Sequence, residues 1–273
     1  MFEIVVCIKQ VPMVAELPWD EKTGTLRREA AAGMMNPACK HAVEAALQFK
    51  ESHGASITVM TMGPPAAKQV LHEAIAMGAG RGILICDPLL AGSDTYATSF
   101  VLARAIKKEI PGFGLVLCGA YTSDSETGQV GPQLAEELNV PAAAYAEHID
   151  ISGQTMRVRR LVDNFRETLE MEFPALVTVS MERYKPRYVS FAGLSRAFAG
   201  ARIDVLSAAE LAVTAADLEA NGSRTRVRKV FIRKTMKENV RITGAAANAA
   251  AEFLDRYQRS ISAVIGKSIE TKK

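Results

Sequence analysis

The sequence lacks several features that identify common classes of protein. No run of about 18 apolar residues occurs, so no part of the chain is expected to insert into a membrane. The N-terminal stretch MFEIVVCIKQ has neither the basic region nor the cleavage site of a signal peptide. The four cysteines are far apart and form no CxxC pair, so neither a disulfide framework nor a zinc site is predicted. These absences favour a cytoplasmic protein with reduced cysteines.

Common catalytic and nucleotide-binding motifs are also missing. The first strand-like run is not followed by G-x-G-x-x-G, and no Walker A motif occurs. None of the four histidines has a serine nucleophile elbow nearby, so no catalytic triad is predicted. The formal net charge of +3 is too small to predict nucleic-acid binding. We therefore expect no nucleic-acid partner, no metal site and no hydrolase of these classes.

The first two-thirds of the chain alternates strand-like and helix-like segments. The predicted strands, short and apolar on both faces, are 2–8, 57–62, 82–86 and 115–118. The predicted helices are 37–50, a segment that begins after 63–65 and ends at 77, 95–109 and 133–138. This alternation predicts a Rossmann-like α/β fold whose mostly parallel sheet is covered by helices on both faces. Ligands of such sheets bind beyond the carboxyl ends of the strands.

The pattern changes after Pro141. Segments 142–151, 156–162 and 167–173 alternate as a β-meander would, and the apolar run 175–180 is predicted to return to the main sheet. Residues 1–205 are therefore the predicted α/β domain, with the meander at 142–180. Residues 206–273 are predicted to form either an arm that packs on another subunit or a flexible extension. The arm contains a short helix at 211–223, seven basic residues within 224–237, and a terminal helix at 245–261.

The most informative motif is segment 119–132, which reads GAYTSDSETGQVGP between a strand-like run and a helix-like run. The first turn of a helix has free backbone N–H groups and partial positive charge, so anions bind there. The side chains of Ser123, Ser125, Thr127 and Gln129 would add hydrogen bonds. Gly128 and Gly131 would let a phosphate approach the backbone closely. The segment predicts either a phosphate-binding loop or an ordinary capped loop.

Two further turns support a nucleotide site. In Asn36-Pro37-Ala38-Cys39, asparagine stands at a helix N-cap and proline at the first helical position. Asn36 is either a cap alone or part of the site. Met62-Gly63-Pro64 forms a strand-to-helix turn that could admit a ring or a ribose. All three turns are predicted to converge at one end of the sheet.

In this order, the motifs resemble those of electron transfer flavoprotein β subunits. CIKQV at 7–11 is similar to their VxVKxV start, MNPAC at 35–39 to their NPxC/D turn, and AIAMGA at 74–79 to their AxAMGA segment. Segment 119–132 is similar to their nucleotide loop. PRY at 186–188 is similar to the PRY that precedes their partner-recognition loop. The resemblance covers residues 2–205 and is weaker in the tail.

The resemblance implies an electron carrier that is not itself an enzyme. The chain would be the β subunit of a heterodimer whose α subunit holds most of the redox FAD, and would hold AMP or a second FAD itself. It would pass electrons between an acyl-CoA dehydrogenase, or another flavin dehydrogenase, and a downstream acceptor. Arg187, Tyr188 and Phe191 would contact that partner. By position, the residues that would hold the nucleotide are Cys7, Asn36, Pro37, Ala38, Cys39, Met62, Gly63, Ala120, Ser123, Asp124, Ser125, Glu126, Thr127, Gly128, Gln129, Val130 and Gly131.

The sequence also departs from the family pattern. Asp163 is followed by Asn164 and the bulky Phe165, where the family signature expects small or acidic residues. The basic run after the recognition loop is reduced to Arg196 and Arg202. The loop sequence ETGQVGP is closer to the DTAQVGP of electron-bifurcating members. It favours FAD over AMP, and a part in flavin-based electron bifurcation with NADH.

Another function class shares this type of sheet. An adenine-nucleotide-binding module of the ATP-pyrophosphatase or universal-stress type would have no redox role. The first type needs an SGGxDS-like loop after the first strand, and the second needs a spaced glycine run before its last helix. Neither occurs, so the electron-carrier hypothesis is favoured.

Overall fold

The computed structural model describes residues 2–13, 19–20, 25–26, 32–220, 223–225 and 240–265. The chain divides into two compact units, Met1–Lys229 and Val230–Lys273. Of the predicted basic segment 224–237, only the first two residues are described, and the remainder lies outside the described residues.

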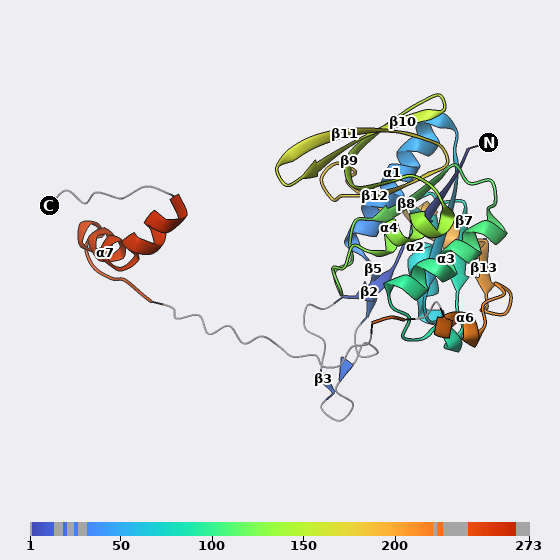
Figure 1. Ribbon diagram of the computed structural model, residues 1–273, viewed down its shortest axis with the longest axis horizontal. Coiled ribbons are helices and arrows are strands. Elements are labelled where there is room, and N and C mark those ends of the chain that lie inside the picture. The colour runs from blue at the N-terminus through green and yellow to red at the C-terminus, as the bar shows by residue number, and fades with distance from the viewer. Residues whose placement is uncertain are drawn as a thin grey trace. The chain divides into compact units, whose positions relative to one another are not determined.

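The described residues of the first unit are organised around a nine-stranded sheet (Figure 1), in the order β11-β10-β9-β12-β8-β1-β6-β7-β13. Along the sheet from β9 through β12, β8, β1, β6 and β7 to β13, each strand runs parallel to its neighbours in this series. Strand β10 runs antiparallel to both β9 and β11. The strands are β1 (Glu3–Cys7), β6 (Ser56–Met62), β7 (Arg81–Ile85), β8 (Leu115–Gly119), β9 (Ala142–Ser152), β10 (Thr155–Val162), β11 (Phe165–Glu172), β12 (Ala175–Val179) and β13 (Ile203–Leu206). The predicted α/β class, mostly parallel sheet and meander are confirmed.

Helices cover both faces of this sheet (Figure 1). Helices α1 (Pro37–His53) and α2 (Lys68–Met77) pack on one face, and α3 (Thr95–Glu109) and α4 (Val130–Leu138) pack on the other. Side chains of a strand point alternately to its two faces. In β1, Val6 therefore joins the core under α1 and α2, and Val5 joins the core under α3 and α4. The continuous apolar runs of the central strands follow from burial on both faces.

The helix boundaries follow from local chemistry. Helix α3 has the predicted bounds, because the Asp94 carboxylate accepts hydrogen bonds from the amides of Tyr96 and Ala97 and so caps its first turn. Helix α1 begins at Pro37 and ends where Gly54 adopts a left-handed conformation with φ of 67°. The remaining short elements are β2 (Gln10–Pro12), β3 (Trp19–Asp20), β4 (Thr25–Leu26), β5 (Gly33–Met35), η2 (Pro65–Ala67), η3 (Pro88–Leu90) and α6 (Ala215–Ala220).

Helix α5 (Phe191–Gly200) and strand β13 are among the elements that were not predicted from the sequence. Helix α5 packs on α2, where Gly193 lets its backbone approach the carbonyl oxygen of Ala76. Strand β13 pairs with β7 at the sheet edge, and its Val205 is exposed. A short edge strand of mixed polarity gives little periodicity, which explains why it was missed. The predicted domain boundary at 205 falls inside β13, and the first compact unit continues to Lys229.

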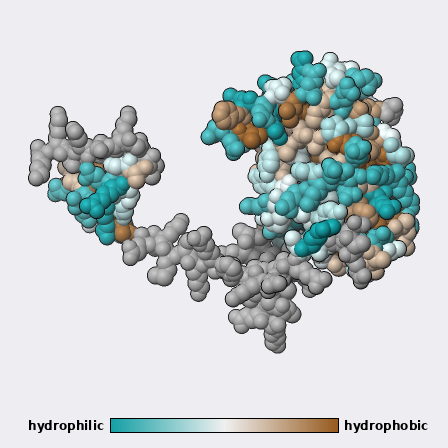
Figure 2. Space-filling model, in the orientation of Figure 1, coloured by the Kyte–Doolittle hydropathy of each residue, from teal (hydrophilic) through white to brown (hydrophobic). Residues whose placement is uncertain are grey.

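The hairpin between β10 and β11 explains how the chain accommodates Phe165, where the family signature expects a small or acidic residue. Asp163 and Asn164 both have positive φ, at 47° and 69°, as the two central residues of a type I′ turn require. Phe165 therefore lies outside the turn, at the start of β11, with 73% of its surface exposed. With the exposed Leu161 it contributes to the hydrophobic patch at the hairpin tip in Figure 2.

The second unit contains α7 (Ala246–Ile265), close to the predicted terminal helix. Its larger apolar residues Phe253, Tyr257 and Ile261 recur at four-residue spacing and so share one face. The rings of Phe253 and Tyr257 lie 5.2 Å apart. Among the helices of the described residues, none is both long and apolar enough to cross a membrane.

Gly119, at the end of β8, provides a test of the packing between β8 and the start of α1. A Cβ there would lie 2.7 Å from both the carbonyl carbon of Ala38 and the amide nitrogen of Cys39, at the start of α1. We expect Gly119→Ala to lower the free energy of unfolding by about 1–3 kcal/mol in urea denaturation, because backbone must move to accept the methyl group. The matched variant Gly112→Ala adds a Cβ in open space and should change stability by less than about 0.5 kcal/mol. Equal losses in the two variants would contradict this packing.

Candidate nucleotide-binding site

Three adjacent parallel strands bring the predicted turns together. In the sheet, β1 lies between β6 and β8, and Cys7 is in register with Met60 on one side and Cys118 on the other. Because parallel strands end at the same edge, the turns after Met62 and Gly119 open beside the end of β1. The structure therefore brings together the segments that the sequence predicted to converge.

Asn36 connects these segments to one another. Its side chain is buried, with Nδ2 donating to the carbonyl oxygen of Tyr121 at 2.8 Å and Oδ1 accepting from the amide of Ser123 at 3.0 Å. Its own backbone amide donates to the carbonyl oxygen of Lys9, just after β1, at 2.9 Å. Asn36 occupies the predicted N-cap position of α1, but its side chain makes no capping bond to that helix. The interpretation of Asn36 as a cap alone is therefore wrong, because its amide is bonded across to the loop after β8.

The loop after β8 is held in a defined conformation by its own polar groups. The Lys9 ammonium contacts both carboxylate oxygens of Asp124, at 2.9 and 2.8 Å. The hydroxyls of Thr122 and Ser125 are 2.9 Å apart, and the amide of Glu126 donates to the carbonyl oxygen of Thr122 at 2.8 Å. Such a loop needs little further ordering to bind a ligand.

Several backbone amides of this loop remain available for a ligand. Within the described part of the chain, the amides of Thr127, Gly128 and Gln129 donate to no protein acceptor. They directly precede α4, where the helix dipole favours an anion. Gly128 has a φ of 62°, which a residue with a side chain rarely adopts. Backbone amides without an acceptor at a helix start are groups to which phosphates bind in proteins.

Two of the predicted site residues have structural partners that the sequence did not reveal. The side-chain oxygen Oε1 of Gln129 accepts a hydrogen bond from the Thr95 hydroxyl at 2.9 Å. A Cβ at Gly131 would overlap the methyl group of Thr178 in β12, so this glycine allows α4 to approach the sheet. The interpretation that Gly131 gives a phosphate room is therefore corrected: its buried position serves helix–sheet packing.

Two buried cysteines, Cys39 in the first turn of α1 and Cys118 near the end of β8, have raised pKa values. Burial raises the pKa of Cys39 despite a hydrogen bond with the Asn36 side chain. A hydrogen bond with Cys7, together with burial, raises the pKa of Cys118 well above its usual value. These thiols are buried and act as small, weakly polar residues of the core. In the part of the chain that the structure describes, no three His, Cys, Asp or Glu residues are grouped as metal ligands would be.

The start of α3 joins this loop to the beginning of the C-terminal arm. Asp94, besides capping α3, accepts hydrogen bonds from the amide and the hydroxyl of Thr225, at 3.0 and 3.1 Å. Its own amide donates to the Ser223 hydroxyl at 2.7 Å. Burial alone would raise the pKa of Asp94, but the hydrogen bonds outweigh it and lower that pKa. The same helix end carries Thr95, which holds Gln129 in the loop.

Some residues around the site were missed by the sequence interpretation. They are Lys9, Asp94, Thr95 and Tyr145, whose hydroxyl would lie 2.9 Å from a Cβ at Gly128. The Gly-Ser-Asp sequence before α3 was an available N-cap signal for Asp94. The other contacts span long sequence separations, and a single sequence does not indicate them.

The predicted recognition segment is anchored by Arg187. Its guanidinium donates to both carboxylate oxygens of Glu44, at 2.8 and 3.0 Å, and to Glu51 at 2.7 Å. Burial raises the pKa of Glu44, yet the hydrogen bonds from Arg187 and Gln48 outweigh it and lower the pKa below its usual value. The structure gives Arg187 an intramolecular role, whereas Tyr188 and Phe191 beside it are almost fully exposed.

Arg187→Ala tests this anchor. We expect a loss of about 2 kcal/mol in the free energy of unfolding at pH 7, because the buried Glu44 carboxylate keeps its charge without its main donor. A carboxylate with a lowered folded pKa stabilises the fold above its unfolded pKa, and this contribution is lost as the pH falls through the folded pKa. The difference between wild type and variant should therefore shrink in acid. Arg166→Ala removes an exposed arginine as control, and an equal loss there would rule out the ion pair as the cause.

Comparison with known proteins identifies the family of this chain. Residues 23–213 match the family described as "Electron transfer flavoprotein domain". The chain is 38% identical over 255 residues to the electron transfer flavoprotein subunit beta of Clostridium acetobutylicum, covering 93% of this chain and 97% of the relative. It is 38% identical over 252 residues to the caffeyl-CoA reductase-Etf complex subunit CarD of Acetobacterium woodii, covering 92% and 95%. It is 34% identical over 258 residues to the protein FixA of Azorhizobium caulinodans, covering 92% of each.

The fold and the convergent strand-end loops are those of a Rossmann-like α/β protein. The chain belongs to the electron transfer flavoprotein family, which confirms the resemblance to its β subunits.

Proposed function

We propose that this chain is the β subunit of a heterodimeric electron transfer flavoprotein and binds an adenine nucleotide at the ends of β1, β6 and β8. The observation that carries the proposal is the loop fastened by Asn36, whose amides at Thr127, Gly128 and Gln129 have no protein acceptor within the described residues. Family membership supports the electron-transfer role.

The residues present fit the two ends of an adenine nucleotide. Free amides at the start of α4 and the hydroxyls of Ser123 and Thr127 suit phosphate oxygens. The small, weakly polar side chains of Cys7 and Cys118 suit the adenine ring. FAD, held mainly by the α subunit, supplies the redox chemistry when bound, and this chain's residues contribute binding and orientation.

The proposed partners are supported by two exposed apolar surfaces. Tyr188, Phe191 and Phe198 expose their rings on and before α5, and would meet a flavin dehydrogenase or reductase. The apolar face of α7 would pack on the α subunit, since an amphipathic helix needs a second apolar surface. The name of the Acetobacterium relative, a subunit of a caffeyl-CoA reductase complex, supports a partner that acts on acyl-CoA compounds.

The identity of the nucleotide separates two types of carrier. The loop sequence ETGQVGP favours a second FAD, and with it a role in NADH-dependent electron bifurcation. AMP in this subunit would instead make the protein a simple carrier.

The test is to co-express the chain with its α subunit, purify the complex, denature it and identify the released cofactors by chromatography. We expect a yellow heterodimer that releases two FAD molecules. One FAD with one AMP would keep the electron-carrier function and overturn the assignment of FAD to this subunit. Adenine nucleotide without any flavin would instead support the ATP-binding module, and no nucleotide at all would overturn the proposal.

The variant Asn36→Ala localises the nucleotide within the complex. Without its side chain the loop after β8 loses two bonds to α1, so we expect the nucleotide of this subunit to fall to less than about one-tenth of the wild-type content. The FAD of the α subunit should remain. Asn139→Gly is the matched control, because glycine accepts the left-handed conformation at the end of α4. Unchanged nucleotide content in Asn36→Ala would remove this residue from the site.

A further inference from the structure

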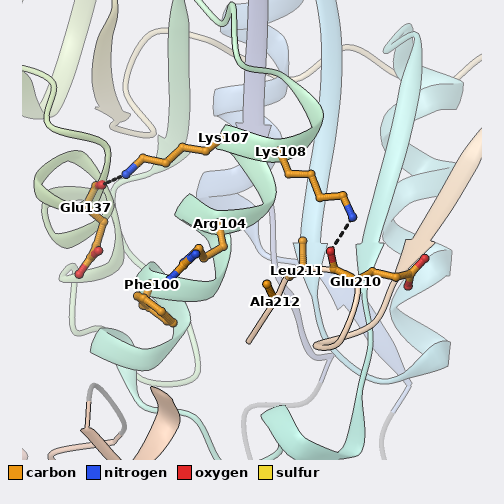
Figure 3. A pocket seen from close by; sticks show the side chains of 8 residues that line it. All are labelled: Phe100, Arg104, Lys107, Lys108, Glu137, Glu210, Leu211 and Ala212. Atoms are coloured by element: carbon orange, nitrogen blue, oxygen red, sulfur yellow. Dashed lines mark hydrogen bonds between the residues drawn. The ribbon is translucent and has the colours of Figure 1, made fainter. Parts of the chain in front are cut away.

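A hollow lies on the α3–α4 face of the sheet (Figure 3). Its volume is about 530 Å³, within the range of small-molecule sites. Its walls come from α3, from α4 and from the turn after β13; they are Phe100, Arg104, Lys107, Lys108, Glu137, Glu210, Leu211 and Ala212.

This hollow is separate from the proposed nucleotide site. Thr95, which contacts the nucleotide loop, begins α3, whereas Lys107 is twelve residues further along the same helix. At a rise of 1.5 Å per residue, the two positions are about 18 Å apart. The inference about the hollow therefore does not depend on the proposed function.

Three positive charges line one side of the hollow. Arg104, Lys107 and Lys108 are three and four residues apart, so they share one face of α3. Figure 3 shows the two lysines extending to opposite walls, with Arg104 one turn away over the Phe100 ring. Its guanidinium carbon lies 5.2 Å from the centre of that ring.

Most of the hydrogen-bond donors of these cations are unused. Lys107 donates to the carbonyl oxygen of Glu137 at 2.6 Å, and Lys108 to that of Glu210 at 2.5 Å. Each ammonium group has three donors, so two remain on each lysine. Arg104 makes no hydrogen bond to any described residue, which leaves its five N–H groups free.

Two nearby carboxylates accept hydrogen bonds from neighbouring serine and threonine residues. Glu210 accepts hydrogen bonds from the amide and the hydroxyl of Ser207, at 2.8 and 2.7 Å. Asp217 accepts in the same way from Thr214, at 2.8 and 2.7 Å. The carboxylate of Glu137 points away from Lys107 in Figure 3. No described carboxylate lies within ion-pair distance of the three cations. Glu210 and Asp217 nevertheless interact electrostatically with Lys108 and Arg104, and the lining, with three cations and two carboxylates, has a net charge of +1.

We propose that this hollow binds the phosphate group of a small organic phosphate. The planar guanidinium of Arg104 can donate two parallel hydrogen bonds to phosphate oxygens, and the two ammonium groups can approach from either side. Phe100 and Leu211 give the organic part of the ligand an apolar wall. The unused donors of three side chains match the several oxygens of a phosphate better than the two oxygens of a carboxylate.

Titration calorimetry of the purified heterodimer with inorganic pyrophosphate, in 150 mM salt, tests the proposal. We expect one pyrophosphate site per complex. Arg104→Gln, and separately the double variant Lys107→Gln with Lys108→Gln, should each weaken binding by at least about tenfold, because each removes charge-assisted hydrogen bonds. Arg166→Gln, which removes an exposed arginine of β11, should bind as the wild type does.

The other outcomes overturn the proposal. Absence of binding to the wild type would show that the hollow is not a phosphate site. Equal weakening by Arg166→Gln would show that pyrophosphate binds through general surface charge. Unchanged affinity in both α3 variants would place the pyrophosphate elsewhere. Loss of binding in Asn36→Ala, with the α3 variants unaffected, would assign the pyrophosphate to the nucleotide site, so failure here is distinguishable from failure of the proposed function.

Discussion

The buried side chain of Asn36 is the contact on which the arrangement of the site depends. It fastens the start of α1 to the loop after β8 through Tyr121 and Ser123, while its backbone amide holds the segment after β1 through Lys9. These segments are 27 or more residues apart along the chain and meet only because β1 and β8 are parallel neighbours. A buried amide with partners on both its nitrogen and its oxygen favours one loop conformation strongly, because any other would leave polar groups unpaired.

The consequences for binding follow from that contact. With the loop held by Asn36 and by the Lys9–Asp124 pair, the amides before α4 are left free at the positive end of a helix dipole. A preformed anion site costs little ordering on binding. The close approach of Gly119 to the first residues of α1 keeps the two walls of the site together.

The sequence predicted the elements whose signals are local. The bounds of α3 came from its helix-like pattern, and those of the central strands came from apolar runs that reflect burial on both faces. Helix α5 was missed because much of its apolar surface is exposed and because it is rich in alanine and glycine.

The sequence predicted which segments form the site, but it did not predict what the individual residues of those segments do. Motif order placed Asn36 and the loop after β8 together, but their cross-chain bonds depend on tertiary contact. Gly131 and Arg187 have the residue types that ligands or partners use, and the structure uses them for packing against Thr178 and for pairing with Glu44. Residue type alone does not distinguish these uses, because each depends on a neighbour distant in sequence.

Amide hydrogen exchange at Ser123 tests the role of Asn36 most directly. The amide of Ser123 lies on an exposed loop residue, and its hydrogen bond goes to the Asn36 side chain. Protection there should therefore be measurable in the wild type and should disappear in Asn36→Ala, while the amides within β8 and α1 remain protected. Equal exchange of the Ser123 amide in the two proteins would contradict the claim that Asn36 holds the loop.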